Sequence, residues 1–420
     1  MKRLIILFIL FILFIPCFGQ SASKELKLLQ FSASVKDNLY NNIVPFWLNH
    51  SVDTINGGFW GTVDVYGNAN PQSSKGLVLN ARILWTFSAL YLKDKTPEFL
   101  MMSKRAYHYL SDHFIDHTYG GAFFTVDKDG NPIDSTKYTY AILFVIYGLS
   151  EYHRATGDPE ALELAKKVFL DLDKHAHDEQ FLGYLEFFQR DWSAMPPGSR
   201  NAIGNADKLM NTLLHAMEAF ANLYRVWKSP LLESRLKEVI VLTLEKGINP
   251  ITKRQYYMFN RDWTSSAIYE SYGHDIEGAW LMHDCAEVLG DKDLIERVKV
   301  ACMGWAESTI EVFHPDGRLI YESVNGVSSG NTLQWWAQAE AVLGYMNAWK
   351  ITGDEIWLDR AILVWQFTDK YIVDKEYGEW LFGLDRDGMV NRRTAKISAW
   401  KAPYHNGRMG LEVIRRTKID

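Results

Sequence analysis

The 420-residue sequence has few cysteines, few prolines and no excess of basic residues. It contains 3 cysteines and 12 prolines, and its 45 Lys and Arg residues do not outnumber its 51 Asp and Glu residues. So few cysteines exclude a disulfide scaffold, and we interpret Cys285 and Cys302 as buried free thiols. The lack of a basic excess argues against a nucleic acid or an anionic membrane as partner. Because 47% of the residues are hydrophobic, we expect a globular chain with a large core.

Motifs for nucleotides, metals and covalent catalysis are also missing. There is no phosphate-binding loop, dinucleotide fingerprint, nucleophile elbow or Cys/His zinc spacing. His113 and His117 have the spacing of metal ligands, but no glutamate of the zinc-protease type stands between them, so we interpret them as surface residues. We therefore expect no metal and no cofactor, and chemistry carried by acidic and basic side chains alone.

The only long apolar run lies at the N-terminus. Two basic residues precede residues 4–15, and small residues follow, which is typical of a secretory signal peptide. We expect cleavage after Gly19, so that residues 1–19 are a signal peptide and 20–420 a single catalytic domain of a periplasmic or secreted protein. Lipidation of Cys17 is the weaker alternative, because Pro16 stands where a small residue is expected. No later segment approaches the length that spans a bilayer, so we expect no membrane contact after cleavage.

A Gly/aromatic segment recurs along the chain. Residues 57–68 are echoed at 120–131 and, in part, near 183–192, 259–263, 316–321 and 378–385. Between these segments, apolar residues follow helical spacing at 76–92, 136–156, 206–228, 273–289, 332–350 and 404–416, and a second helix is predicted at 98–114, 159–175, 231–247, 292–313 and 355–371. This pattern predicts an all-α (α/α)6 toroid, or barrel, of six helix pairs, with short β-hairpins and loops at one end.

Three histidines stand in polar and aromatic surroundings on predicted inner helices. They are His215, His274 and His405, each on a different helix of the ring and directed toward its axis. Asn211 shares a helix face with His215, because the two are four residues apart. A single helical histidine is usually a structural hydrogen-bonding group, but three at equivalent places of a ring favour acid/base chemistry.

Several carboxylates are candidates for a sugar site. Glu277, Glu340 and Asp207 are the acids that an inverting glycosidase would need. We interpret Glu277, three residues after His274, as the orienting partner of a base. Glu340 shares a face with Trp336, an arrangement that suits a sugar ring, although a buried core tryptophan is the equally weighted alternative.

Arg82 stands among Leu, Ile, Trp and Phe residues. A guanidinium is costly to bury without an anionic partner. That partner would be a sugar oxygen or a developing enediolate in an active site, or a carboxylate in a structural salt bridge.

Four segments together resemble one family. Residues 80–89 (NARILWTFSA), 271–277 (SYGHDIE), 335–340 (WWAQAE) and 400–408 (WKAPYHNGR) are similar to signature segments of the cellobiose 2-epimerases, within the N-acylglucosamine 2-epimerase superfamily, and the likeness runs from about Leu39 to Val413. The resemblance implies reversible epimerisation at C2 of the reducing-end sugar of β-1,4-linked disaccharides of the cellobiose or mannobiose type, through an enediolate. It also implies the toroidal fold.

The resemblance implies roles for individual residues. His274 and His405 match the acid/base pair, and His215 matches a third catalytic histidine. The substrate-binding positions implied are Arg82, Asn211, Glu277, Trp336, Glu340 and Trp400. Ala402 departs from the cysteine common in the last motif. We expect a small oligosaccharide as the partner, and a monomer.

Three other functions are compatible with the residues. The first is a monosaccharide 2-epimerase or an aldose–ketose isomerase of the same superfamily. The second is an inverting glycoside hydrolase using Glu277 or Glu340, which the histidine-rich site disfavours. The third is a non-catalytic sugar-binding protein, which would leave three convergent histidines without a role.

Overall fold

The computed structural model describes residues 24–196, 206–265, 269–324, 327–328, 333–385 and 387–418. The predicted signal peptide and Cys17 lie outside these ranges. Within them, no helix combines the length and the apolar character that a bilayer span requires. Cys285 and Cys302 are buried free thiols, as predicted.

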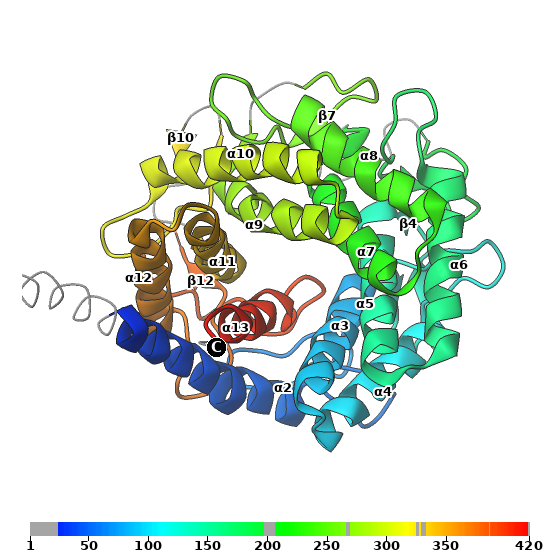
Figure 1. The fold of residues 1–420 in the computed structure, drawn as a ribbon. Coiled ribbons are helices and arrows are strands. Elements are labelled where there is room, and N and C mark those ends of the chain that lie inside the picture. The colour runs from blue at the N-terminus through cyan, green and yellow to red at the C-terminus, as the bar shows by residue number, and fades with distance from the viewer. Residues whose placement is uncertain are drawn as a thin grey trace, which may run out of the picture.

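A ring of inner helices surrounds the axis of the described molecule (Figure 1). Each packs against the next along the chain, and the last packs back against the first. Side chains on nearly all faces of these helices are buried, because neighbouring inner helices cover one side and the outer helices cover the other. They are α3 (Leu77–Asp94), α5 (Thr139–Thr156), α7 (Met210–Val226), α9 (Tyr272–Leu289), α11 (Trp335–Thr352) and α13 (Tyr404–Arg416). The predicted helices are confirmed, although several begin later than expected because a short strand precedes them.

Outer helices cover the ring, each packed on the inner helix before it. They are α4 (Pro97–His113), α6 (Pro159–Ala176), α8 (Pro230–Lys246), α10 (Lys292–Ser308) and α12 (Glu355–Tyr371), with a short 3-10 turn, η2 (Thr309–Val312), after α10. Three of the turns that join an inner helix to its outer helix have the same glycine–aspartate arrangement. In α6, for example, Gly157 adopts a left-handed conformation and Asp158 then caps the helix by accepting from two backbone N–H groups. Gly290 and Gly353 precede the capping aspartates of α10 and α12 in the same way.

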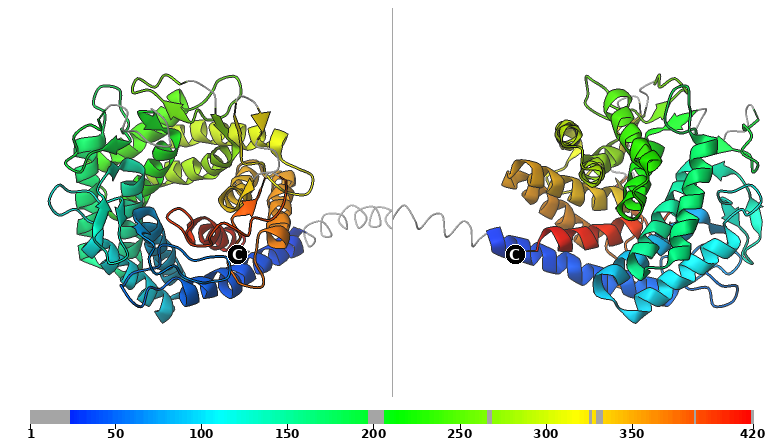
Figure 2. Two further views of the ribbon diagram at one scale, coloured as in Figure 1. Left: turned by 180° about the vertical axis from the view of Figure 1, so that it is seen from behind. Right: turned by 45° about the vertical axis from the view of Figure 1, so that its right-hand side comes forward.

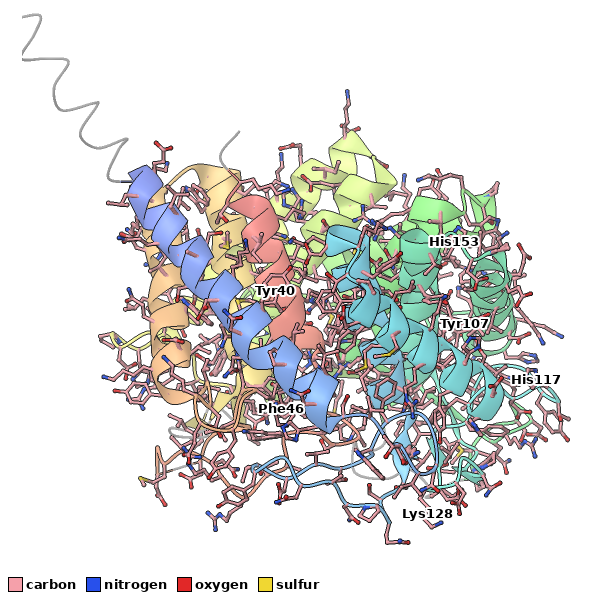
Figure 3. The ribbon with its side chains drawn as sticks, turned by 90° about the horizontal axis from the view of Figure 1, so that it is seen from below. Tyr40, Phe46, Tyr107, His117, Lys128 and His153 are labelled. Carbon is pink, nitrogen blue, oxygen red and sulfur yellow. The ribbon has the colours of Figure 1, made fainter. Side chains whose placement is uncertain are left out.

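The sixth outer element comes from the other end of the chain. Residues 24–38 are helical and continue through a π-helical turn, η1 (Leu39–Ile43), into α2 (Val44–His50). This N-terminal helix lies between α12 and α4 and packs against α13 (Figures 1 and 2). Figure 3 shows Tyr40 and Phe46 along it. The six pairs predicted from the sequence are therefore completed by pairing the first helix with the last.

Short strands gather at one end of the ring. A strand before an inner helix pairs antiparallel with a strand of the next repeat, and a bridge between Val63 and Ile397 closes the circle. In Figure 3, Lys128 marks this hairpin end and His153 the opposite end. The pairs are β1 (Lys75–Gly76) with β2 (Thr125–Val126), β4 (Lys137–Tyr138) with β5 (Phe187–Phe188), β6 (Lys208–Leu209) with β7 (Met258–Phe259), β8 (Tyr269–Ser271) with β9 (Glu322–Val324), and β11 (Leu333–Gln334) with β12 (Gly383–Leu384); β3 (Pro132–Asp134) and β10 (Val327–Ser328) extend two of these sheets.

Buried ion pairs anchor four of the hairpins. In each, a lysine ahead of an inner helix reaches an aspartate that follows an outer helix, at 2.7–2.9 Å. The pairs are Lys75–Asp53, Lys137–Asp116, Lys208–Asp178 and Lys396–Asp374. Because a buried charge without its partner is strongly destabilising, these pairs hold the strands in place at the N-terminal ends of the inner helices.

Candidate active site

A cavity of about 360 Å³ lies at the hairpin end of the ring. Its wall is built from the strands and the first two turns of the inner helices, so that residues far apart in sequence converge. Asn211 and His215 are the second and sixth residues of α7, and Trp336 is the second residue of α11. The sequence-predicted residues that line the cavity are Arg82, Asn211, His215, His274, Glu277, Trp336, Trp400 and His405.

His405, at the start of α13, is backed by a carboxylate. Its Nδ1 lies 2.7 Å from Oε1 of Glu340, whose Oε2 accepts a hydrogen bond from Trp280 Nε1 at 2.8 Å. Burial, reinforced by the charges of Arg82 and Arg408, holds the pKa of His405 well below its usual value, so the ring is neutral at pH 7. Burial raises the pKa of Glu340, but the charge of Arg408 and its 2.7 Å hydrogen bond favour the ionised form. A carboxylate only accepts, so the single ring proton of His405 lies on Nδ1 and Nε2 carries a lone pair. His405 is therefore arranged as a base.

His215 has the same arrangement on α7. Its Nδ1 lies 2.9 Å from Oε2 of Glu218. Burial works against ionisation of Glu218, but the charge of Arg408 and the hydrogen bond to His215 lower the pKa of this carboxyl to about 2. Burial lowers the pKa of His215. This histidine is thus also neutral, with its proton directed at a carboxylate.

Arg408 joins these carboxylates. Its Nη2 donates to Glu277 Oε1 at 2.9 Å and to Glu340 Oε1 at 2.7 Å, and its Nη1 donates to Glu218. Glu277, Glu340 and His405 offer ligand atoms within 4.8 Å of one another, a grouping that could hold a cation, and the Arg408 guanidinium supplies that positive charge. One side chain therefore fixes the partners of two histidines. Arg408 is not among the sequence-predicted site residues, although an arginine three residues after His405 on the same helix was a usable signal.

Glu277 lies elsewhere than the sequence analysis expected. Glu277 and His274 share helix α9, but the Glu277 carboxylate does not orient His274. It pairs with Arg408 and lies 3.9 Å from Nδ1 of His405. The physical reason is that a buried carboxylate requires a buried cation, and Arg408 is the cation within reach. Burial and the neighbouring Glu340 raise the pKa of Glu277 well above its usual value.

His274 has a hydroxyl partner where the other two histidines have carboxylates. Its Nδ1 lies 2.6 Å from Ser271 Oγ, and its ring packs against Tyr257 and Trp336 with centroids 5.3 and 4.8 Å away. Burial lowers the pKa of His274 to about 3. Ser271, which caps α9, is not among the sequence-predicted site residues.

Among the described residues, all hydrogen-bond partners of Arg82 are neutral groups. Its Nη2 donates to the Tyr140 hydroxyl at 2.8 Å and its Nη1 to the Trp400 carbonyl at 3.0 Å. Its guanidinium lies over the rings of Phe144 and Tyr404, at 4.4 and 4.9 Å from their centroids. A structural salt bridge within the described chain is therefore not its role. The arrangement leaves a positive charge at the cavity wall for an anionic group.

The remaining candidates lie at different depths. Trp400 is 45% exposed at the mouth, with its ring 6.2 Å from that of Phe124. Glu340 is fully buried behind His405 and does not line the cavity. Asp207 also stands outside the lining. His113 lies outside it too, with Nδ1 3.2 Å from a backbone carbonyl.

Known proteins resemble this chain in both sequence and fold. The family model for N-acylglucosamine 2-epimerase (GlcNAc 2-epimerase) matches residues 58–406. Cellobiose 2-epimerase of Bacteroides fragilis is 42% identical over 90% of this chain and 97% of its own, and that of Ruminococcus albus is 37% identical over 91% and 98%. The solved structure of cellobiose 2-epimerase from Bacillus thermoamylovorans superposes with a TM-score of 0.87 at 35% identity, covering 92% of this chain and 99% of that one.

Proposed function

The chain belongs to the N-acylglucosamine 2-epimerase family, on the branch of the cellobiose 2-epimerases, and is a carbohydrate epimerase; from this premise we propose that it inverts C2 of the reducing-end sugar of a β-1,4-linked disaccharide. The observation that carries the proposal is the convergence of His274 and His405 on one cavity from helices α9 and α13. Both rings contact Trp336, at 4.8 and 5.5 Å between centroids.

Epimerisation at C2 needs two proton-transfer groups. Once the sugar ring is open, the C1 carbonyl makes the C2 proton acidic. One imidazole takes this proton, and the other, in its protonated form, returns a proton to the opposite face of C2, so the pair shares one proton. We assign proton removal from the glucose-type sugar to His405, because the Glu340 carboxylate behind Nδ1 stabilises the imidazolium that forms. In the reverse direction the two histidines exchange roles.

The negative charge of the enediolate needs a partner as well. Arg82 presents a guanidinium without a described carboxylate partner at the cavity wall. Such a group stabilises charge that develops on O1 and O2 more than it stabilises the neutral sugar. Asn211, whose buried Oδ1 has no described partner, lies on the same wall and suits a sugar hydroxyl.

The preference for a disaccharide rests on the mouth of the cavity. The half-exposed Trp400 ring offers an apolar face to a second sugar outside the reacting one. A monosaccharide would leave this face uncovered. The cellobiose 2-epimerase relatives, named for a disaccharide, support the same choice.

The test is incubation of the mature protein with cellobiose and with β-1,4-mannobiose in deuterated water, followed by NMR and mass spectrometry. We expect an isobaric disaccharide whose reducing end has the opposite configuration and deuterium at C2. Release of monosaccharides would assign the site to hydrolysis. Turnover of free glucose or mannose alone, or formation of a ketose as main product, would assign it to the monosaccharide branch.

We also propose that the protein acts outside the cytoplasm, because its N-terminal segment resembles a signal peptide. Cell fractionation with antibody detection tests this. A periplasmic or medium fraction of protein beginning near Gln20 is expected, and full-length protein in the cytoplasm would contradict it.

A further inference from the structure

Three site histidines have partners of two chemical kinds. His405 and His215 face carboxylates through Nδ1, whereas His274 faces the hydroxyl of Ser271 at 2.6 Å. A carboxylate can only accept, so it keeps a proton on Nδ1. A hydroxyl can either donate or accept, and it rotates to do so. The partner of His274 therefore leaves both ring nitrogens free to change their proton.

The surroundings of Ser271 settle which role it takes in the resting molecule. Its Oγ already accepts from the backbone N–H of His274, at 3.4 Å, as the cap of α9. Among the described residues, the acceptor within reach of the hydroxyl proton is Nδ1 of His274. If Nδ1 carried the proton, the hydroxyl proton would have no described acceptor in a buried place, which is costly.

We propose that Ser271 is a positioning residue that donates its hydroxyl to Nδ1 of the resting His274 and so holds the ring proton on Nε2, at the cavity. The proposal rests on the proposed function, because it assigns the resting tautomers of its two acid/base groups. His405 waits with a lone pair and His274 with a proton at Nε2, which makes the two faces of the site different before substrate enters.

The hydroxyl also allows the second state that catalysis needs. Once substrate is bound, His274 takes up a second proton from solvent, and the Ser271 hydroxyl turns and accepts from Nδ1–H. After Nε2 has delivered its proton to C2, the ring is neutral with its proton on Nδ1, still donating to Oγ. The resting state returns when His405 releases to solvent the proton that it took from C2, the proton of His274 moves from Nδ1 to Nε2 through solvent, and the hydroxyl turns back. No atom of Ser271 is gained or lost in this cycle.

The direct test is 15N NMR of the mature protein labelled at histidine, because ring 15N shifts distinguish a protonated nitrogen from one with a lone pair. The His274 signals are those absent from His274→Gln. We expect the Nε2–H tautomer for His274 and Nδ1–H for His405 in the wild type. In Ser271→Asp, which keeps a capping side chain but replaces the hydroxyl with an acceptor, His274 should convert to Nδ1–H.

Kinetics with the sugar that turns over give the second test. Ser271→Ala should lower kcat by about 10- to 100-fold with a change in KM below about threefold, since a lost orienting partner typically has this effect. Ser271→Thr keeps the hydroxyl and should remain within about threefold of the wild type. Asp291→Ala removes the cap of α10 in the same manner but touches no histidine, so it controls for the lost helix cap.

Two results would overturn the proposal. One is a wild-type His274 with its proton on Nδ1, or one whose tautomer does not change in Ser271→Asp. The other is a Ser271→Ala enzyme with the kcat of Ser271→Thr. The NMR experiment needs no substrate, so its outcome stands apart from whether the protein epimerises disaccharides.

Discussion

Replacing Glu340 by glutamine tests the charge arrangement around Arg408. The substitution keeps the shape of the side chain and an oxygen facing His405 Nδ1, but removes the negative charge that stabilises the imidazolium. A hydrogen bond to a charged group contributes about 1.5–3 kcal/mol, so we expect kcat to fall about 10- to 150-fold. KM should change little, because Glu340 is fully buried and does not line the cavity.

Glu340→Gln should not lower the stability of the protein, although it lowers kcat. The carboxylates of Glu277 and Glu340 lie within 4.8 Å of each other, so two ionised groups repel by about 3.5 kcal/mol at an effective dielectric constant of about 20. The raised pKa of Glu277 means that its contribution to stability is present at low pH and is lost as pH rises above the unfolded-state value of about 4.3. Because the glutamine removes one source of this shift, the free energy of unfolding at pH 7 should stay the same or increase.

Steady-state kinetics and urea unfolding at pH 7 check both parts. Glu151→Gln is the matched control, since Glu151 is a buried acid near the opposite end of α5 that accepts from Arg154 and Asn222. Its kcat should be that of the wild type. The reasoning is refuted if Glu340→Gln keeps kcat within threefold, or if it loses stability by more than 1 kcal/mol alongside activity, on the order of a lost hydrogen bond.

Other expectations follow from the same contacts. Arg82→Met should lower kcat/KM about 100- to 1000-fold while thermal unfolding stays at or above the wild-type temperature, because the lost cation has no described carboxylate partner; a lower Tm would contradict this. Trp400→Ala should raise KM for disaccharides up to about tenfold, the effect of losing one aromatic contact, and leave any turnover of monosaccharides unchanged. Lys75→Met should reduce the free energy of unfolding by about 3–5 kcal/mol in urea, because Asp53 is left buried without its cation, and Lys75→Met combined with Asp53→Leu should recover most of the loss. Burial lowers the pKa of all three site histidines, so the unfolded chain binds more protons and the free energy of unfolding should fall as pH drops below about 6.5; an unchanged value from pH 8 to 5 would contradict it.

Much of the fold could be predicted because it is local. The apolar spacing of each inner helix and the Gly–Asp turns, as at Gly157 and Asp158, specify a helix pair without reference to the rest of the chain. The repeat then implies how pairs stack. It is for this reason that the predicted helix at 355–371 coincides with α12.

The missing parts depend on distant residues. Nothing in the sequence of residues 24–50 marks them as partners of α13, since that contact exists only when the ring closes. Likewise, the pairing of Glu277 with Arg408 could not be found from spacing along α9, because their helices are separated by more than a hundred residues. Helical spacing predicts which side chains share a face, but not which charge a neighbouring helix supplies.

The closure of the ring by the first and last helices ties assembly to synthesis. Residues 24–50 are synthesised well before their inner partner, α13, so until α13 follows, the chain can form only an open arc. The two helices meet where Thr417 Oγ1 donates to Ser32 Oγ at 2.7 Å. Since His405 arrives with this last helix, a nascent or C-terminally shortened chain lacks both the closing wall and one of the two proton-transfer groups. The proton-transfer pair is thus assembled only when α13 has joined the ring.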